Sequence, residues 1–281
     1  MKYILENINE NDRLEYQALQ RNYSPEFDFL EDELILPDHS IVLDAGCGSG
    51  VVSRLIAKKN LGKDVKVLAI DSCEDQRLED AKRRAIKNGL SSIHFQKGDI
   101  RKLALEDCSV DVVISRFVYE HNPGDEAFKA ITQEAYRVLK PNGVYYVIDT
   151  DGVLANISSD NKEFMLLTEK LLQAVSDVFE PYPCRKLPQF LSNAGFKFKI
   201  IKNIPMIFHE PSDLEYEDAL WKVRFNNMKH RINQALGERS KWYVNQFFEE
   251  LWNRDNLYYC NRFVFKAFKD GGALLNGKKE K

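Results

Sequence analysis

The sequence predicts an α/β protein in which helices cover both faces of an open, doubly wound sheet. Two observations predict this fold: short apolar runs alternate with helical apolar patterns from Ile41 to Asp149, and a glycine-rich turn follows the first run. This alternation is typical of successive βαβ units around a parallel sheet. The chain has 281 residues, of which 44% are hydrophobic, so it is long enough to bury a full core.

Five apolar runs are the expected parallel strands of this sheet. The helices between them show apolar residues every three or four positions. These helices end at Asn88–Gly89 and at Pro141–Gly143, because such residues tolerate positive φ or cannot continue a helix. The expected strands are IVLDA (41–45), VKVLAI (65–70), IHFQ (93–96), DVVIS (111–115) and VYYVID (144–149).

After Asp149, longer helical patterns replace the regular alternation. We expect a helix over 164–179, a shorter helix that ends at Gly195, and a sixth strand over 197–204. Strand character returns over 256–268 after a helical region rich in aromatic residues. The predicted organisation is N-terminal helices over the ligand site (1–40), a core (41–205 and 256–270) with a helical insertion at about 151–186, and a helical lid (206–255).

The charge and the cysteine content limit the classes of function. The net charge is −3 and the pI is about 6.0, so the chain lacks the excess of lysine and arginine that most nucleic-acid-binding proteins use. The 5 cysteines are scattered without C-x-x-C spacing, which disfavours a zinc site and a disulfide framework. The N-terminal segment is too polar for a secretory signal, and no run of about 18 apolar residues occurs. We therefore expect a cytoplasmic protein without a metal, a nucleic-acid partner or a membrane partner.

The glycine-rich turn distinguishes between two classes of nucleotide ligand. A dinucleotide-binding turn has the spacing G-x-G-x-x-G, whose third glycine lets the following helix approach while its N-terminus binds a pyrophosphate. Here Gly46, Gly48 and Gly50 have the spacing G-x-G-x-G. Val51 stands where the third glycine of the dinucleotide fingerprint belongs. The spacing therefore disfavours a dinucleotide, and with it an oxidoreductase.

Acidic residues lie at the ends of three consecutive expected strands. Asp44 lies two residues before Gly46, where its carboxylate repels a pyrophosphate and attracts a cation. Asp71 ends the second strand, where an acidic residue can accept hydrogen bonds from both hydroxyl groups of a ribose. Asp99 follows the third strand and can accept a hydrogen bond from the adenine amino group, with Ile100 against the adenine ring. Each acid alone could be a helix cap, but together they fit S-adenosylmethionine, a nucleoside with a sulfonium, an ammonium and no phosphate.

Four segments resemble, in order, the motifs of the class I S-adenosylmethionine-dependent methyltransferases: VLDAGCGSG, IDSCE, KGDI and EAYRVLKPNGVYYVIDTD. The resemblance covers about residues 41–151 and implies a Rossmann-like sheet of seven strands, the last of them antiparallel and late in the chain. The N-terminal segment ENDRLEYQALQRNY resembles a helix that places Arg13, Tyr16 and Gln17 near the methionine moiety in one branch of this family. The cofactor-binding residues that the resemblance implies are Tyr16, Asp44, Gly46, Cys47, Gly48, Gly50, Asp71, Ser72, Asp99, Ile100, Ser115 and Arg116.

The acceptor is expected on the same side of the sheet as the cofactor, because ligands bind outside the carboxyl ends of parallel strands. His121, in RFVYEHNPG, is the preferred candidate for a general base, since it follows the fourth strand and imidazole titrates near neutral pH. The structural alternative is that His121 is oriented on the cofactor side of this loop or caps the helix that begins at Asp125. Other candidate bases are His209, Asp149, Asp151 and Tyr182, and candidate walls of an apolar pocket are Tyr182, Phe208, His209, Trp221 and Phe225, unless these aromatics pack helix on helix.

We predict S-adenosylmethionine-dependent methyl transfer to an oxygen or nitrogen nucleophile of a small molecule, such as a secondary metabolite, by in-line displacement. The protein is expected to act as a monomer or a homodimer. One alternative is a protein or RNA methyltransferase, which needs an open groove or a basic surface. Another alternative is a non-catalytic partner subunit that only binds the cofactor.

Overall fold

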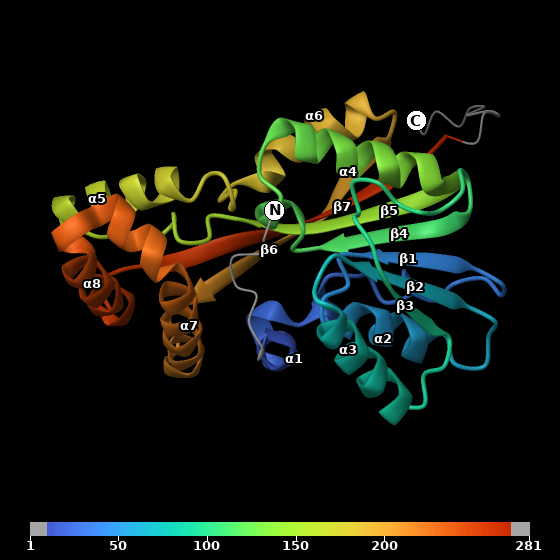
Figure 1. The fold of residues 1–281 in the computed structure, drawn as a ribbon, viewed down its shortest axis with the longest axis horizontal. Coiled ribbons are helices and arrows are strands. Elements are labelled where there is room, and N and C mark those ends of the chain that lie inside the picture. Colours follow the sequence, from blue (N-terminus) through green and yellow to red (C-terminus); the bar gives the residue numbers. More distant parts are fainter. Residues whose placement is uncertain (1–9, 271–281) are drawn as a thin grey trace, which may run out of the picture.

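The computed structural model describes residues 10–270 and shows a seven-stranded sheet with helices on both faces (Figure 1). The first five strands pair in parallel, and β7 is antiparallel to both of its neighbours. The prediction of a doubly wound sheet with an antiparallel seventh strand is confirmed. In sheet order, the strands are β3 (Ile93–Lys97), β2 (Lys66–Asp71), β1 (Ile41–Ala45), β4 (Val110–Arg116), β5 (Leu139–Asp151), β7 (Tyr258–Phe268) and β6 (Lys197–Phe208).

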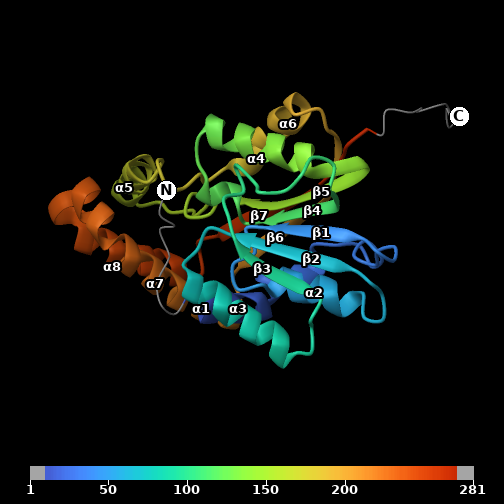
Figure 2. The same cartoon turned by 45° about the vertical axis from the view of Figure 1, so that its right-hand side comes forward.

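Helices form a layer on each face of the sheet (Figures 1 and 2). One layer contains α1 (Glu10–Leu19), α2 (Val51–Lys59) and α3 (Asp75–Lys87), and the other contains α4 (Asp125–Val138) and α6 (Pro183–Asn193). Successive side chains of a strand point to opposite faces. Val42 and Leu43 accordingly belong to two different buried clusters, one beneath each layer. Four short 3-10 helices complete this frame: η1 (Arg21–Tyr23), η2 (Pro25–Phe27), η3 (Tyr119–His121) and η4 (Gly237–Arg239).

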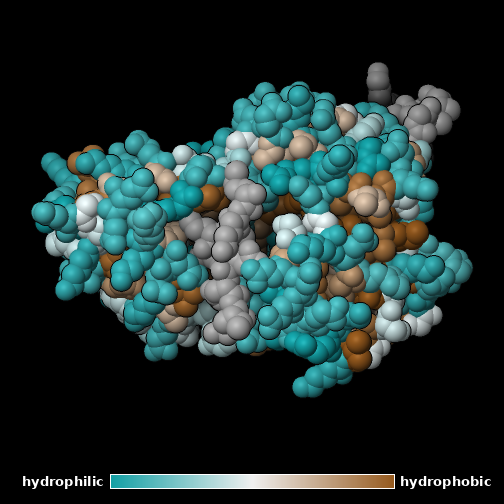
Figure 3. Space-filling view, viewed as in Figure 1, coloured by the Kyte–Doolittle hydropathy of each residue, from teal (hydrophilic) through white to brown (hydrophobic). Residues whose placement is uncertain are grey.

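Three further helices pack together beyond the end of the sheet where β5 and β6 finish (Figure 1). These are α5 (Lys162–Ala174), α7 (Pro211–Leu236) and α8 (Ser240–Trp252), and we refer to them as the helical cover. Aromatic rings fill its interior, where Phe164 stacks on Tyr243 at 5.4 Å between centroids. Its outer surface is mainly hydrophilic (Figure 3). Within residues 10–270, no helix is both long and apolar enough to cross a bilayer.

A buried ion triad joins the N-terminal segment to the sheet. The Asp28 carboxylate, which is fully buried, lies 2.6 Å from Nε of Arg116 and 2.8 Å from Nε of Arg262. Burial lowers the pKa of Arg262 to about 10, although the charge of Asp28 acts in the opposite direction. Arg262 therefore remains charged at neutral pH. Since Arg116 also lines the pocket described below, the triad fixes one wall of that pocket.

Candidate active site

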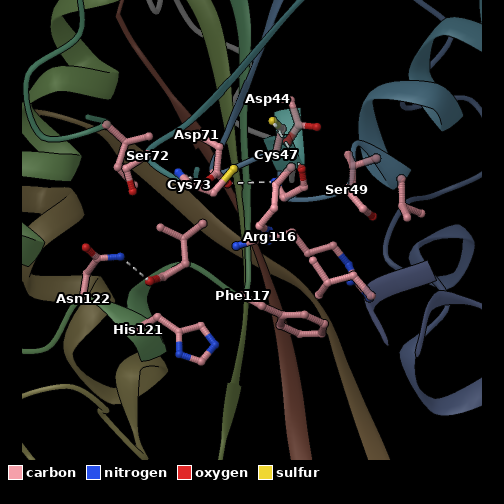
Figure 4. Close-up of a pocket in the computed structure, with 18 of the residues that line it drawn as sticks. Asp44, Cys47, Ser49, Asp71, Ser72, Cys73, Arg116, Phe117, His121 and Asn122 are labelled. Atoms are coloured by element: carbon pink, nitrogen blue, oxygen red, sulfur yellow. Dashed lines mark hydrogen bonds between the residues drawn. The ribbon is translucent and has the colours of Figure 1, made fainter. Parts of the chain in front are cut away.

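A pocket lies where the segments that follow β1, β2, β3 and β4 meet (Figure 4). The helix α1 contributes Arg13, Leu14, Gln17 and Ala18 to its wall, and α7 contributes Arg224. Figure 4 shows the two carboxylates of Asp44 and Asp71 near each other, with His121 in another part of the pocket. The sequence-predicted residues that line the pocket are Asp44, Gly46, Cys47, Gly48, Asp71, Ser72, Asp99, Ile100, Arg116 and His121.

The glycine turn after β1 comes close to the segment after β4. The backbone N–H groups of Gly46 and Cys47 donate to the Ile70 carbonyl at 2.8 and 3.1 Å, which ties the turn to β2. Gly46 has a φ of 82°, and a Cβ at this position would lie 2.6 Å from a methyl group of Val118. A side chain at Gly46 would therefore both strain the backbone and fill the space between the two segments.

Asp44 places a buried carboxylate beneath this turn. Its Oδ2 accepts a hydrogen bond from the Ser53 hydroxyl at 2.5 Å, and its side chain lines the pocket. Burial raises the pKa of Asp44 to about 6; the hydrogen bond from Ser53 lowers it, whereas the charge of Asp71 raises it. A cationic group in the pocket would favour the ionised form of this carboxylate.

Asp71 connects the turn after β1 to the turn after β2. Its Oδ2 accepts from the backbone N–H of Gly48 at 2.8 Å, and its Oδ1 accepts from that of Cys73 at 2.8 Å. A carboxylate has about four lone-pair sites. Asp71 therefore keeps acceptor capacity for two vicinal hydroxyl groups of a ribose.

Asp99, after β3, is held by a neighbouring guanidinium. Nε and Nη2 of Arg101 lie 2.9 and 2.8 Å from its two carboxylate oxygens, and the Arg101 backbone N–H also donates to it. The hydrogen bonds from Arg101 lower the pKa of Asp99 despite its partial burial. Asp99 is thus an ionised and oriented acceptor, which suits an exocyclic amino group.

His121 and Glu120 form a pair at the end of η3. The His121 Nε2 lies 3.2 Å from the Glu120 Oε1, while the Glu120 Oε2 accepts from the Thr150 hydroxyl at 2.8 Å. Burial would raise the pKa of Glu120, but the contacts with His121 and Thr150 outweigh it and keep this pKa below its usual range. When Nε2 carries the proton and donates a hydrogen bond to Glu120, the lone pair of the imidazole is on Nδ1. Sequence reasoning did not single out Glu120, although it directly precedes His121 in the chain.

Three of the predicted cofactor-binding residues lie outside the lining of the pocket. Tyr16 is 58% exposed, and its ring lies 5.5 Å from that of Tyr216. Gly50 precedes α2, where a Cβ would lie 2.7 Å from the Phe95 ring. The Ser115 hydroxyl is buried in the sheet and lies 2.9 Å from the Tyr145 hydroxyl.

The further candidate bases and the aromatic candidates for pocket walls do not line the pocket either. Asp149 is fully buried and accepts from the backbone N–H groups of Tyr119 and Thr150, and Asp151 accepts from that of Cys184. The prediction of aromatic walls from the lid is wrong: Phe208, Trp221 and Phe225 belong to the core of the helical cover, Tyr182 lies beneath the Arg185 guanidinium, and His209 is exposed. These aromatics are buried because a cover of three amphipathic helices needs a core of its own.

Phe117 is an aromatic wall residue that the sequence did not indicate. It follows β4 with a φ of 57°, and its ring lies 4.0 Å from the Arg116 guanidinium carbon (Figure 4). A non-glycine residue in this backbone region costs free energy and is enriched at functional sites. No local sequence pattern predicts such a backbone conformation.

The chemistry of the pocket fits a cationic nucleoside without phosphate. Asp44 can hold an ammonium or sulfonium group, Asp71 a ribose and Asp99 an adenine amino group. Five arginines also line the pocket, and three of them, Arg13, Arg101 and Arg116, are paired with carboxylates. The carboxylates of Asp44 and Asp71 therefore suit S-adenosylmethionine and disfavour a pyrophosphate beside the turn after β1.

The affinity for this cofactor is expected to fall as the pH is lowered through about 6, the pKa of Asp44. Protonated Asp44 offers no charge to the ammonium group, so the dissociation constant should be roughly tenfold larger near pH 5 than near pH 7. Calorimetric titration with S-adenosylhomocysteine across this range measures the effect. An Asp44→Asn variant should bind weakly at each pH, and a wild-type affinity independent of pH would contradict the assignment.

Comparisons with known proteins agree with this geometry. The family model described as a methyltransferase domain matches residues 36–210. A sterol 24-C-methyltransferase of Gibberella zeae is 35% identical over 135 residues, which cover 48% of this chain and 32% of that protein. A ubiquinone biosynthesis O-methyltransferase of Haemophilus ducreyi is 34% identical over 131 residues, or 45% of this chain and 49% of that protein. The chain thus matches about a third of the length of the sterol methyltransferase and about half of the ubiquinone enzyme.

The fold also agrees with a solved structure. A geranyl diphosphate methyltransferase, whose structure was determined in complex with SAM, matches this chain with a TM-score of 0.53 at 15% identity. The match covers 94% of this chain and 91% of that one. At this identity the likeness supports the Rossmann-like fold.

Proposed function

The chain belongs to the methyltransferase-domain family, and on this premise we propose that it transfers the methyl group of S-adenosylmethionine to an oxygen or nitrogen of a small molecule. The observation that carries the proposal is the set of three carboxylates, Asp44, Asp71 and Asp99, which lie at or just after the ends of β1, β2 and β3 and line one pocket. The pocket continues from these carboxylates to His121 and Phe117. The acceptor would bind in the part of the pocket that these two residues line.

The role of the protein in this reaction is to bind and to orient. The cofactor supplies an activated methyl group, because a sulfonium is a good leaving group. Asp44 and the turn after β1 would hold the methionine end, Asp71 the ribose, and Asp99 with Ile100 the adenine. The helices α1 and α7 cover the pocket and would exclude water from it.

His121 would take the proton from the acceptor as the new bond forms. Its imidazole lines the pocket, is 16% exposed, and is oriented by the buried carboxylate of Glu120. A neutral imidazole held by a carboxylate is suited to general-base catalysis. Glu120 is a positioning residue in this proposal, since its carboxylate acts through the imidazole.

An assay with labelled cofactor tests the proposed class of acceptor. A cell extract is separated by ultrafiltration into small molecules and macromolecules, and each fraction is incubated with the protein and methyl-tritiated S-adenosylmethionine. We expect label in a small-molecule product that is separated from the unreacted cofactor by chromatography. Label in acid-precipitable protein or RNA would contradict the proposal, and cofactor binding without any labelled product would favour a non-catalytic subunit.

A further inference from the structure

Arg224 brings a positive charge from the helical cover to the wall of the pocket. It lies in α7, far along the chain from the glycine turn, and lines the same pocket as Asp44 and His121. Its Nη1 atom is enclosed by the protein and has no hydrogen-bond partner among residues 10–270. Leaving an enclosed guanidinium N–H without an acceptor is unfavourable, so this position is suited to an anionic ligand.

Three other arginines of the pocket have carboxylate partners, whereas Arg224 forms no ion pair within the described part of the chain. Each of these three arginines therefore has a carboxylate partner within the protein, and Arg116 shares its partner, Asp28, with Arg262. The pairs are Arg13 with Glu10 at 2.5 Å, Arg101 with Asp99 at 2.8 Å, and Arg116 with Asp28 at 2.6 Å.

The guanidinium of Arg224 is held in place by packing. Its central carbon lies 4.7 Å from the centre of the Trp221 ring, one turn earlier in α7. Trp221 is only 2% exposed and contacts Phe247 in the core of the helical cover. A cation over a fixed indole ring is attracted electrostatically and loses little freedom when it binds a ligand.

The two carboxylates whose charges act on Arg224 are engaged elsewhere. Glu217 accepts from the Tyr23 hydroxyl at 2.6 Å, and Glu120 is held by His121 and Thr150. Burial raises the pKa of Glu217 to about 7, although the charge of Arg224 lowers it. Glu217 is thus only partly ionised at neutral pH and neutralises Arg224 incompletely.

The position of Arg224 favours the acceptor over the cofactor as its ligand. The charge of Arg224 acts on Glu120, which is the neighbour of His121, the proposed base. The methionine end of the cofactor, by contrast, is expected at the turn after β1, where a Cβ at Gly48 would lie 3.0 Å from Leu14 of α1. Arg13 and Gln17 of α1 also line the pocket and hydrogen-bond each other at 2.9 Å, and the charge of Arg13 acts on Arg224.

We infer that Arg224 binds an acidic group of the methyl acceptor, a carboxylate or a phosphate, and so selects anionic small molecules. This inference rests on the proposed function and specifies its substrate class. A guanidinium can donate two parallel hydrogen bonds to either group. The acidic group would be fixed at α7, and the nucleophile of the same molecule would be directed toward His121.

Binding of matched probes to the protein loaded with S-adenosylhomocysteine tests the inference. The probes are para-hydroxybenzoate, para-hydroxyphenyl phosphate and para-hydroxybenzamide, which share a ring and a hydroxyl group and differ in charge. By calorimetry, at least one acid should bind about tenfold or more tightly than the amide. Arg224→Gln should remove this preference, whereas Lys229→Gln, an exposed cation of the same helix, should retain it. The acid that binds more tightly identifies the group that Arg224 selects.

Three results would overturn the inference. Equal binding of the three probes by the wild type, including equally weak binding, would show that the pocket does not select acids. A preference that persists in Arg224→Gln would place the selectivity elsewhere. A loss of S-adenosylhomocysteine affinity in that variant would assign Arg224 to the cofactor. Failure of the wild type to bind S-adenosylhomocysteine would instead contradict the proposed function itself.

Discussion

Replacement of Asp44 by alanine is expected to weaken the binding of S-adenosylmethionine by about 30-fold or more. The variant removes the buried carboxylate that faces the pocket beneath the glycine turn, and the ammonium and sulfonium groups of the cofactor lose their counter-charge. Calorimetric titration measures the affinity. The fold should persist, because an ionised carboxylate is costly to bury and its removal relieves this cost; circular dichroism checks the fold.

Ser53→Ala is the matched control for Asp44→Ala. It removes the hydroxyl that donates to Asp44 at 2.5 Å but keeps the carboxylate in the pocket. The loss of this hydrogen bond raises the pKa of Asp44, so the affinity for the cofactor should fall in Ser53→Ala, but less than in Asp44→Ala, and it should recover as the pH is raised. If Asp44→Ala bound the cofactor as tightly as the wild type, the assignment of the methionine end to the turn after β1 would be wrong.

The sheet could be predicted from the sequence because each of its strands carries a local signal. The apolar runs after residue 40 indicated the positions of β1 to β4 and part of β5, which begins earlier, at Leu139, and so includes Pro141–Gly143. The segment KFKIIKNI indicated the first part of β6, which continues to Phe208. The strand β7 was expected within 256–268 and lies at Tyr258–Phe268. Its antiparallel direction was implied by the resemblance to class I methyltransferases, since the run of apolar residues does not specify the direction of a strand.

The parts of the site that the sequence did not predict depend on contacts between distant segments. The triad of Asp28, Arg116 and Arg262 joins three parts of the chain that no local pattern connects. Arg224 was not singled out, because one arginine in a long amphipathic helix resembles any solvated cation until the position of the helix is known. The aromatic residues of the cover were assigned to the pocket because they are frequent in this part of the chain. Composition does not show whether the aromatic face of a helix lines a pocket or packs against other helices.

Replacement of His121 by alanine is expected to lower kcat by about 100- to 10,000-fold with an acceptor whose nucleophile must lose a proton. The variant removes the imidazole that Glu120 orients in the pocket, so the proton has no acceptor as the new bond forms. The affinity for S-adenosylhomocysteine should change little, because the carboxylates assigned to the cofactor remain. Steady-state kinetics and calorimetry measure the two effects separately.

His230→Ala, an exposed histidine of α7, is the matched control and should leave kcat unchanged. Added imidazole should partly restore the activity of His121→Ala, because it can occupy the vacated space and accept the proton, whereas a purely structural loss would not respond. Glu120→Gln should lower kcat less than His121→Ala, since it keeps the imidazole but not the carboxylate that orients it. Full activity of His121→Ala would assign proton transfer to another group or to solvent.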